Sequence, residues 1–177
     1  MVNFLVISGL ITIMASTFTA TILQNLKFRG SLAAQSTAEL LRYNMLTSLQ
    51  NEDSWPNTVN DTNNSSLDCL RNGSNCAAGS YPISVIKDAA DLPVIDNTVA
   101  GEGFTMSGVR CSTFSTTSPD PTCPFHVEIS WTPICGASCN PPPTVRLSIV
   151  FSYSTASEKG QIFNPSKYNM VIDRSSF

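Results

Sequence analysis

The sequence predicts an α+β fold in which one long N-terminal helix packs on a small antiparallel β-sheet head with disulfide-closed loops. Three observations support this prediction. The first 55 residues contain no proline and keep an apolar pattern typical of a helix, two later segments alternate apolar and polar residues, and the six cysteines fall into close pairs. With 177 residues, of which 42% are apolar, the chain is long enough for one packed domain besides an extended helix.

Residues 1–26 contain no charged side chain and are rich in isoleucine, leucine and phenylalanine. At 1.5 Å rise per residue, such a helix reaches across a bilayer core of roughly 30 Å. Three interpretations compete: a cleaved signal peptide, a buried core helix and a retained membrane anchor. A signal peptide normally begins with a positively charged region, which is missing here, and a core helix that is apolar all round needs a large surrounding protein. We therefore predict that residues 1–26 form a transmembrane helix.

Residues 27–53 are predicted to continue the same helix as an amphipathic half. Apolar residues recur close to the 3.6-residue period of an α-helix, and charged or polar residues occupy the other faces. This apolar series consists of Leu26, Ala33, Ala34, Ala38, Leu40, Leu41, Met45, Leu46 and Leu49. Gly30 is a weak point that costs about 1 kcal/mol relative to alanine. We expect the helix to run through it and to end near residue 53, closed by the Trp55-Pro56 pair, because the residue before a proline is disfavoured in the helical region.

Residues 54–177 are predicted to form a β-rich globular head. Residues 54–80 are rich in Asn, Ser, Asp and Thr, and we expect a loop region there. Beyond them, residues 125–131 and 145–153 alternate apolar and polar side chains and predict two half-buried strands. Weaker strand candidates are residues 83–86, 104–109 and 168–172. An antiparallel sheet of these strands buries its apolar face against the amphipathic half of the helix.

The six cysteines suggest three local disulfides and an oxidising compartment. The most local pairing joins Cys69 to Cys76, Cys111 to Cys123 and Cys135 to Cys139, although six cysteines allow fifteen connectivities. The alternative is a zinc site, because Cys123, His126, Cys135 and Cys139 offer four ligands at plausible spacing. Disulfides are the preferred interpretation, and we predict no metal site.

Charge and motif content argue against nucleic-acid binding and catalysis. The ten basic residues are scattered, with no stripe that would neutralise a phosphate backbone. His126 is the single histidine, and its nearest acid, Glu128, lies on the same face of the strand. A pair of this kind on a sheet surface is usually solvated rather than catalytic. The acids Asp88, Asp91, Asp96 and Glu102 lack calcium-loop spacing and are expected to lie in a solvated loop. We therefore predict no enzyme, no cofactor, no nucleic-acid partner and no small-molecule substrate.

A charge-free apolar N-terminus that runs without a break into an amphipathic helix, followed by a β-rich head with cysteines, resembles the mature subunits of type IV pili and pseudopili. This resemblance implies a structural subunit of a pilus-like filament that acts by assembly in adhesion, motility or secretion. It implies that residues 1–26 form the filament core, that a leader is clipped before Met1 and the new terminus methylated, and that Met1, Phe4 and Leu5 take part in assembly. Other pilin-like subunits and, before assembly, the bacterial inner membrane are the expected partners, and the finished filament is extracytoplasmic.

One position departs from the family's pattern. Members of this family usually carry an acidic residue five positions into the mature chain, where this sequence has Leu5. The acid is thought to pair with a neighbour's N-terminal ammonium, and a buried ammonium without a partner is costly. The departure implies a minor or tip subunit. The alternative function is a single-pass anchored extracytoplasmic binding domain that never polymerises, and a basic leader ending in glycine before Met1 would favour the filament subunit.

Overall fold

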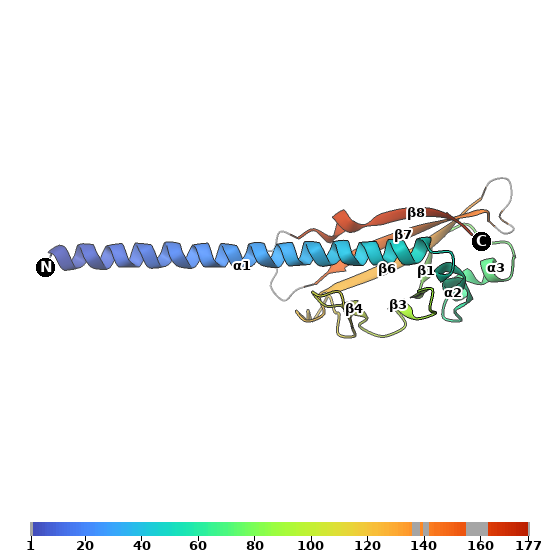
Figure 1. Ribbon diagram of the computed structural model, residues 1–177, viewed down its shortest axis with the longest axis horizontal. Helices are drawn as coiled ribbons and strands as arrows, with labels where there is room; N and C mark the ends of the chain where they lie inside the picture. Colours follow the sequence, from blue (N-terminus) through green and yellow to red (C-terminus); the bar gives the residue numbers. More distant parts are fainter. Residues whose placement is uncertain (1, 136–138, 140–141, 155–162, 177) are drawn as a thin grey trace.

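The structure is a computed structural model that describes residues 2–135, 139, 142–154 and 163–176, with side chains described from Phe18 onward. It consists of one long helix, α1 (Val2–Gln50), and a head packed against the C-terminal half of that helix. The N-terminal half of α1 projects away from the head (Figure 1). The helix continues through Gly30 without a break, as predicted. The expected α+β arrangement of a long helix on an antiparallel sheet is therefore confirmed.

The long helix ends within three residues of the predicted bound at residue 53, but the Trp55-Pro56 pair does not end it. The helix α1 ends at Gln50, and the Asn51 side chain then accepts hydrogen bonds from the backbone N–H groups of Asp53 and Ser54 at 2.8 and 3.1 Å. This cap begins a second helix, α2 (Ser54–Asn60), of which Trp55 and Pro56 are part. Proline is tolerated there because the N–H groups of a first helical turn have no partner within the helix.

Residues 54–80 are not the loop region that the sequence predicts. Besides α2 they contain a 3₁₀ turn, η1 (Ser65–Leu67), and a short helix, α3 (Asp68–Arg71). These elements are too short to show a helical period in the sequence. They carry fully buried residues, Trp55, Leu67 and Leu70, into the core of the head.

Within the described residues, the main sheet has six antiparallel strands. They are β1 (Tyr81–Ile83), β4 (Gly103–Phe104), β5 (Arg110–Cys111), β6 (Phe125–Ile134), β7 (Thr144–Tyr153) and β8 (Met170–Ser175). The order is β5-β4-β6-β7-β8, and β1 also pairs with β6, on the edge opposite β7. A separate hairpin-like sheet joins β2 (Val85–Lys87) to β3 (Pro93–Asp96). The two long strands are those that alternation predicts.

The three weaker strand predictions need correction. Residues 83–86 belong to two strands, because β1 ends at Ile83 and β2 begins at Val85 and pairs elsewhere. Residues 104–109 are mostly a tight turn between β4 and β5, with Gly108 at a φ of +77°, a conformation that favours glycine. Residues 168–172 begin in a 3₁₀ turn, η2 (Pro165–Tyr168), and only then enter β8.

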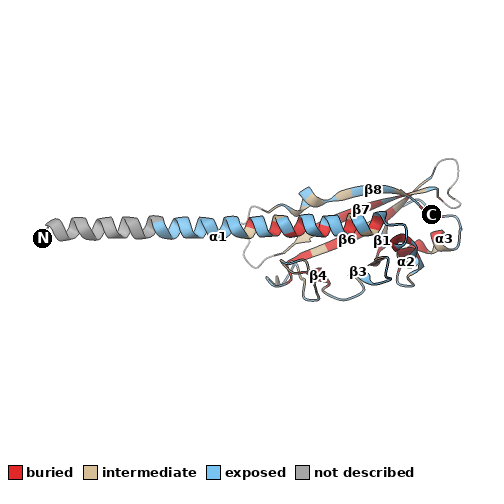
Figure 2. Ribbon diagram, viewed as in Figure 1, coloured by how far each residue is buried: buried red, intermediate tan, exposed pale blue. Residues whose placement is uncertain are grey.

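The core lies between one face of α1 and the inner face of the sheet (Figure 2). On α1 the fully buried residues recur every three or four positions: Ala34, Ala38, Leu41, Met45 and Leu49. On the sheet, inward side chains of β6 and β7 face each other across the ladder, as in the pairs Ile129–Ile149 and Trp131–Leu147.

Three members of the predicted apolar series on α1 lie outside this core. Leu26, Ala33 and Leu40 are exposed. At about 100° per residue, they project more than 90° away from the buried face centred on Ala38 and Met45. The sequence pattern therefore merges two apolar faces of α1, of which only one packs on the head.

The C-terminal end of α1 is tied to the end of the chain. Arg174 of β8 donates a hydrogen bond to the Leu49 carbonyl and lies over the Trp55 ring, with its guanidinium carbon 4.7 Å from the ring centroid. The Trp55 indole N–H donates to the Ser176 carbonyl at 3.1 Å. Desolvation by burial lowers the pKa of Arg174. These contacts join the C-terminal end of α1 and the start of α2 to the strand β8 and the residue after it.

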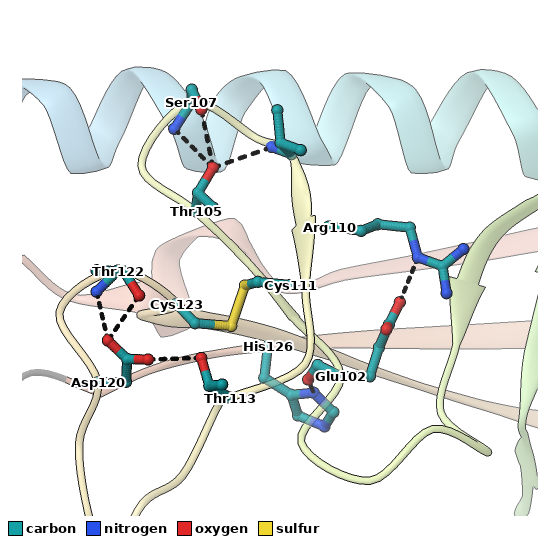
Figure 3. The surroundings of a disulfide bond; sticks show 11 residues. Glu102, Thr105, Ser107, Arg110, Cys111, Thr113, Asp120, Thr122, Cys123 and His126 are labelled. Atoms are coloured by element: carbon teal, nitrogen blue, oxygen red, sulfur yellow. Dashed lines mark hydrogen bonds and ion pairs between the residues drawn. A yellow bond between two sulfur atoms is a disulfide. The ribbon is translucent and has the colours of Figure 1, made fainter.

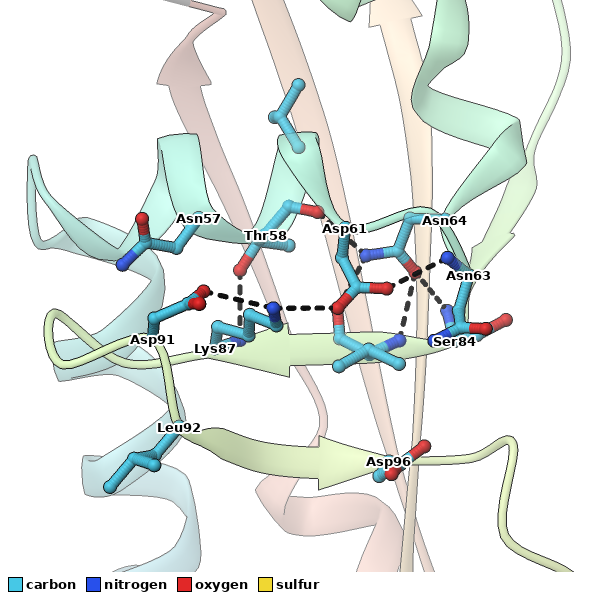
Figure 4. Close-up of polar contacts among 12 residues, drawn as sticks. Asn57, Thr58, Asp61, Asn63, Asn64, Ser84, Lys87, Asp91, Leu92 and Asp96 are labelled. Carbon is cyan, nitrogen blue, oxygen red and sulfur yellow. Dashed lines mark hydrogen bonds and ion pairs between the residues drawn. The ribbon is translucent and has the colours of Figure 1, made fainter.

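Polar residues join α2 to β2 in a small network (Figure 4). The buried Asn64 donates to the carbonyls of Thr58 and Val85, and its Oδ1 accepts from the backbone N–H groups of Ser84 and Val85. Nearby, Lys87 Nζ lies 3.0 Å from carboxylate oxygens of both Asp61 and Asp91. The Asn64 side chain thus makes the hydrogen bonds to the backbone of Ser84 and Val85 that a neighbouring strand would otherwise make.

Within the described residues, no helix contains a stretch long and apolar enough to cross a membrane.

Met1, Phe4 and Leu5, the expected assembly residues, lie outside the residues whose side chains the structure describes.

Candidate assembly surface and a cleft on the opposite face

The described part of α1 carries a continuous apolar surface that the head does not cover. Six exposed apolar side chains fall within a sector of about 120° on the side of the helix away from the head. They are Phe18, Ile22, Phe28, Leu32, Leu40 and Tyr43, and we call this surface the outward stripe. From Phe18 to Tyr43 it extends about 37 Å along the helix. Patches of this kind on soluble surfaces mark sites of interaction with protein or membrane.

The outward stripe continues past the point where the head begins. In the part of α1 that projects beyond the head, Leu23 and Leu26 are also exposed, on sides of the helix outside the stripe. Beside the head, from Ser31 onward, the inner face is buried while Leu40 and Tyr43 remain 47% and 66% exposed. The apolar surface is therefore not confined to the projecting half of the helix.

Two charged residues lie inside the 120° sector of the outward stripe, one towards each edge, and we call them its flanking charges. Arg29 and Glu39 are exposed and lie on opposite sides of its centre line, each about 40° away. Glu39 approaches Arg42 at 3.7 Å, a surface pair of low strength. The stripe thus carries one positive and one negative flank, separated by ten positions along α1.

The head holds α1 near this surface through one polar contact and one close packing contact. The Thr37 hydroxyl lies 2.5 Å from the Met106 carbonyl, in the turn between β4 and β5. In the same turn, a Cβ on Gly108 would approach Leu40 Cδ2 to 3.2 Å. Together these contacts seat the turn against the helix, so the orientation of the stripe relative to the head is set.

On the opposite face of the sheet lies a cleft of about 770 Å³. Because side chains alternate along a strand, the outward residues His126, Glu128 and Ser130 of β6 line it, while their neighbours face α1. Its walls come from residues 80–84, which include β1, and from residues 99–102. The cleft is therefore built by segments that are far apart in the sequence.

Three contacts hold His126 at one end of the cleft, and Figure 3 shows His126 beside Glu102. The Glu102 carbonyl accepts a hydrogen bond from Nδ1 at 2.8 Å, Nε2 lies 3.7 Å from Glu128 Oε1, and the Phe114 ring stacks on the imidazole at a centroid distance of 4.9 Å. The Glu102 carboxylate turns away to Arg110, whose Nε is 2.7 Å from it. This arrangement holds an imidazole in one orientation and places only the Glu128 carboxylate at the surface.

Glu102 corrects the prediction of a solvated acidic loop. Its side chain is only 4% exposed and is paired with Arg110. Arg110 also lies 3.9 Å from Asp96 and donates to the Pro93 carbonyl, so it joins β3 to β5. The pair is a structural link between the two sheets.

The edge of β6 between β1 and β4 is occupied by a side chain. Asn97 donates from Nδ2 to the Val127 carbonyl at 3.1 Å. Its Oδ1 is buried and accepts no hydrogen bond from the described residues. Asn97 thus closes a gap in the sheet beneath the cleft.

The structure joins the cysteines as local spacing predicts: Cys69 to Cys76, Cys111 to Cys123 and Cys135 to Cys139. The zinc alternative requires free thiolates at Cys123, Cys135 and Cys139, which these bonds do not leave. Figure 3 shows the Cys111–Cys123 bond at the base of a loop in which Asp120 accepts a hydrogen bond from Thr113. Hydrogen bonds from Thr113 and Thr122 lower the pKa of Asp120. This loop carries Phe114 to the cleft.

Sequence reasoning placed His126 and Glu128 on the outward face of a strand but did not find the cleft around them. Phe114, Asn97 and Glu102 come from segments without periodicity, so the sequence contains no signal that brings them together. Comparison of this chain with known protein families, curated proteins and solved structures finds no match.

Proposed function

We propose that this protein is a structural subunit of a filament of the type IV pilin or pseudopilin kind, which acts by assembly and surface contact. Residues 1–26 hold it in the inner membrane before assembly and join the filament core afterwards. Its three disulfides suit an extracytoplasmic head, because such bonds persist in oxidising compartments. The resemblance of the sequence to this family supports the proposal from a separate direction.

The observation that carries the proposal is the length of the outward stripe. A lipid bilayer would cover only the part of α1 that projects beyond the head. Leu40 and Tyr43 lie beside the head, so a bilayer does not account for their exposure. Apolar side chains in that position are stabilised by contact with another protein helix, each by about 1.5–3 kcal/mol when fully buried. A filament whose core is made of packed α1 helices supplies this contact for every subunit.

The second candidate is an anchored binding domain that does not polymerise. The cleft on the outer face of the sheet favours it, since a cleft is the usual place for a ligand. This candidate leaves the exposed parts of Leu40 and Tyr43 uncovered. The filament subunit therefore accounts for more of the surface.

Substitution within the outward stripe distinguishes the two. Leu32→Glu and Tyr43→Glu are expected to reduce the amount of this chain in filaments sheared from producing cells by more than tenfold, because a buried unpaired carboxylate costs several kcal/mol. Val171→Glu is the matched control, since Val171 is 62% exposed on β8 and lies outside the stripe. Quantitative mass spectrometry of the sheared fraction gives the readout, and non-reducing gels verify that all variants fold with their disulfides.

Two results would count against the proposal. Stripe variants that assemble at the wild-type level would show that the stripe is not an interface. Full-length protein that stays monomeric in its membrane, with no filament and no crosslinks between copies, would favour the anchored binding domain.

A further inference from the structure

The cleft on the outer face of the sheet has the size of a ligand site and is independent of the assembly surface. Its volume of about 770 Å³ falls within the range of roughly 300–1,000 Å³ that ligand pockets occupy. Its floor is the outward face of β6, whereas α1 packs on the inward face of the same strand. A molecule bound here therefore does not compete with contacts made by the outward stripe.

Charge excludes anionic ligands. Among the described residues that line the cleft there is no lysine or arginine. Of its two acids, Glu102 is committed to Arg110, and Glu128 is 69% exposed at the surface of the cleft. Phosphates, sulfates and other anions meet no cation here, so nucleic acids and acidic sugars are poor candidates.

The polar groups of the cleft suit a ligand with many hydroxyl groups. Within the described part of the chain, the hydroxyls of Ser80, Ser84 and Ser130 have no hydrogen-bond partner, although all three residues line the cleft. Each of these hydroxyls donates one hydrogen bond and accepts others, and the Glu128 carboxylate accepts several. Sugar hydroxyls, which also donate and accept, match this set of groups.

Apolar side chains stand between these polar groups. Phe114 and Val99 line the cleft at the end near His126, and Pro82 and Val150 flank Ser130 and Glu128 as their partners on the neighbouring strands. A pyranose ring has an apolar C–H face as well as hydroxyl edges. Alternating hydroxyl-binding and apolar positions along one strand face are therefore complementary to linked sugar rings.

A peptide is a weaker match. An extended peptide usually binds by adding to a free strand edge. Both edges of β6 are occupied, one by β7 and the other by β1, β4 and the Asn97 side chain. A cationic ligand would depend on Glu128 alone, and a single exposed ion pair contributes about 0–1 kcal/mol.

We propose that the cleft over His126, Glu128 and Ser130 binds a neutral oligosaccharide through its hydroxyl groups and its apolar ring faces. The site is a recognition site: no group on it is placed to break a glycosidic bond, and the saccharide is held without chemical change. The proposal goes beyond the filament function and holds for an anchored head as well as for an assembled subunit.

The test uses the full-length chain in detergent micelles and three neutral probes: chitotetraose, maltotetraose and cellotetraose. We expect at least one of them to shift the backbone amide NMR signals of residues 126–130 and to bind saturably below roughly 10 mM. Sialyllactose and tetralysine serve as anionic and cationic comparisons. Binding by either of these in place of the neutral probes, or by none of the neutral probes at that concentration, would overturn the proposal.

Two substitutions locate the site. Glu128→Gln removes an exposed carboxylate and should weaken binding about tenfold, the loss expected for one charge-assisted hydrogen bond; Glu39→Gln on α1 is its control. Val150→Lys places a long cation against Glu128 across the strand pair and should abolish binding, whereas Val171→Lys on β8 should leave it unchanged. Saccharide binding that survives both cleft substitutions would place the ligand elsewhere and contradict the proposal.

Discussion

At the scale of single residues, Asn64 has the largest predicted effect on stability. Its side chain is 1% exposed and satisfies two backbone carbonyls and two backbone N–H groups, which belong to α2 and to the start of β2. Asn64→Ala removes these four hydrogen bonds; the Thr58 carbonyl keeps the Asp61 N–H as a donor at 3.3 Å, while the other three groups lose their side-chain partner. We expect a loss of about 2–4 kcal/mol in the free energy of unfolding.

Chemical denaturation of the full-length chain in micelles measures this loss. Asn44→Ala, an exposed position on α1, is the matched control and should change stability by less than about 0.5 kcal/mol. Equal stability of Asn64→Ala and the control would mean that water or backbone movement replaces the asparagine.

The pair of Asp61 and Lys87 predicts how stability responds to pH. Burial on its own raises the pKa of Asp61, but hydrogen bonds from the Asn63 backbone and from Lys87 outweigh it and hold the pKa below its ordinary value of 3.8. Hydrogen bonds that Lys87 donates to Asp91 and Asp61 raise the pKa of Lys87 above 10.5. Because its pKa is lowered, the Asp61 carboxyl stabilises the fold above pH 3.8 and loses this contribution as the pH falls through the lowered pKa. Because its pKa is raised, the Lys87 amine contributes fully below pH 10.5 and loses its contribution as the pH rises through the raised pKa.

Measuring the free energy of unfolding between pH 3 and pH 7 tests the contribution of Asp61. The change is expected below roughly pH 4, where this carboxyl group is protonated. The wild-type protein should lose stability there, and Asp61→Asn should show a flatter profile from a lower plateau. Asp91→Asn should have a smaller effect, because Asp91 is 64% exposed and its ion pair with Lys87 is screened by solvent. An unchanged profile for Asp61→Asn would assign the acid sensitivity to other carboxyl groups.

At the scale of elements, the sequence predicts the helices and strands that are long enough to repeat their apolar pattern several times. The helix α1 and the strands β6 and β7 repeat their patterns over enough residues for the period to be visible, and the structure contains all three. The helices α2 and α3 have seven and four residues and show no such pattern. Their positions depend on individual polar contacts, such as the Asn51 cap and the bonds from Arg71 to the Val59 and Asp61 carbonyls, which no local propensity reveals.

The candidate surfaces follow the same rule. The outward direction of His126 and Glu128 follows from alternation along β6, but the walls of the cleft come from turns and loops that tertiary contacts bring together. On α1 the reverse holds, because the apolar residues are visible in the sequence while the face that the head covers is not. Only the buried series from Ala34 to Leu49 separates Leu40 from the core and assigns it to the outward stripe.

At the scale of the whole molecule, the head separates two surfaces. The outward stripe lies on one side of α1, and the cleft lies on the far side of the sheet that α1 covers. In a filament with α1 helices at its centre, the stripe faces inward and the cleft faces solvent. The proposed assembly and the proposed saccharide recognition therefore use different faces of the molecule.

The flanking charges of the outward stripe predict how two copies align. When two parallel helices face each other, the left flank of one meets the right flank of the other, so Arg29 of one copy lies on the same side as Glu39 of the next. The two residues are ten positions apart, so an axial displacement of about 15 Å brings them together. Each copy then offers Arg29 to one neighbour and Glu39 to another. A contact of this head-to-tail kind does not close into a dimer and continues as a filament.

Charge reversal tests this alignment within the proposed filament. Arg29→Glu and Glu39→Arg should each reduce incorporation into sheared filaments severalfold, because each places like charges beside an apolar contact, where repulsion is screened less than in water. The double variant restores opposite charges at the same displacement and should recover most of the wild-type level. Lys27→Glu, a reversal of an exposed charge on the opposite side of the same helix, is the control. If the double variant assembles no better than the single ones while the wild-type chain still forms filaments, then the copies pack at another displacement and the two flanking charges do not meet.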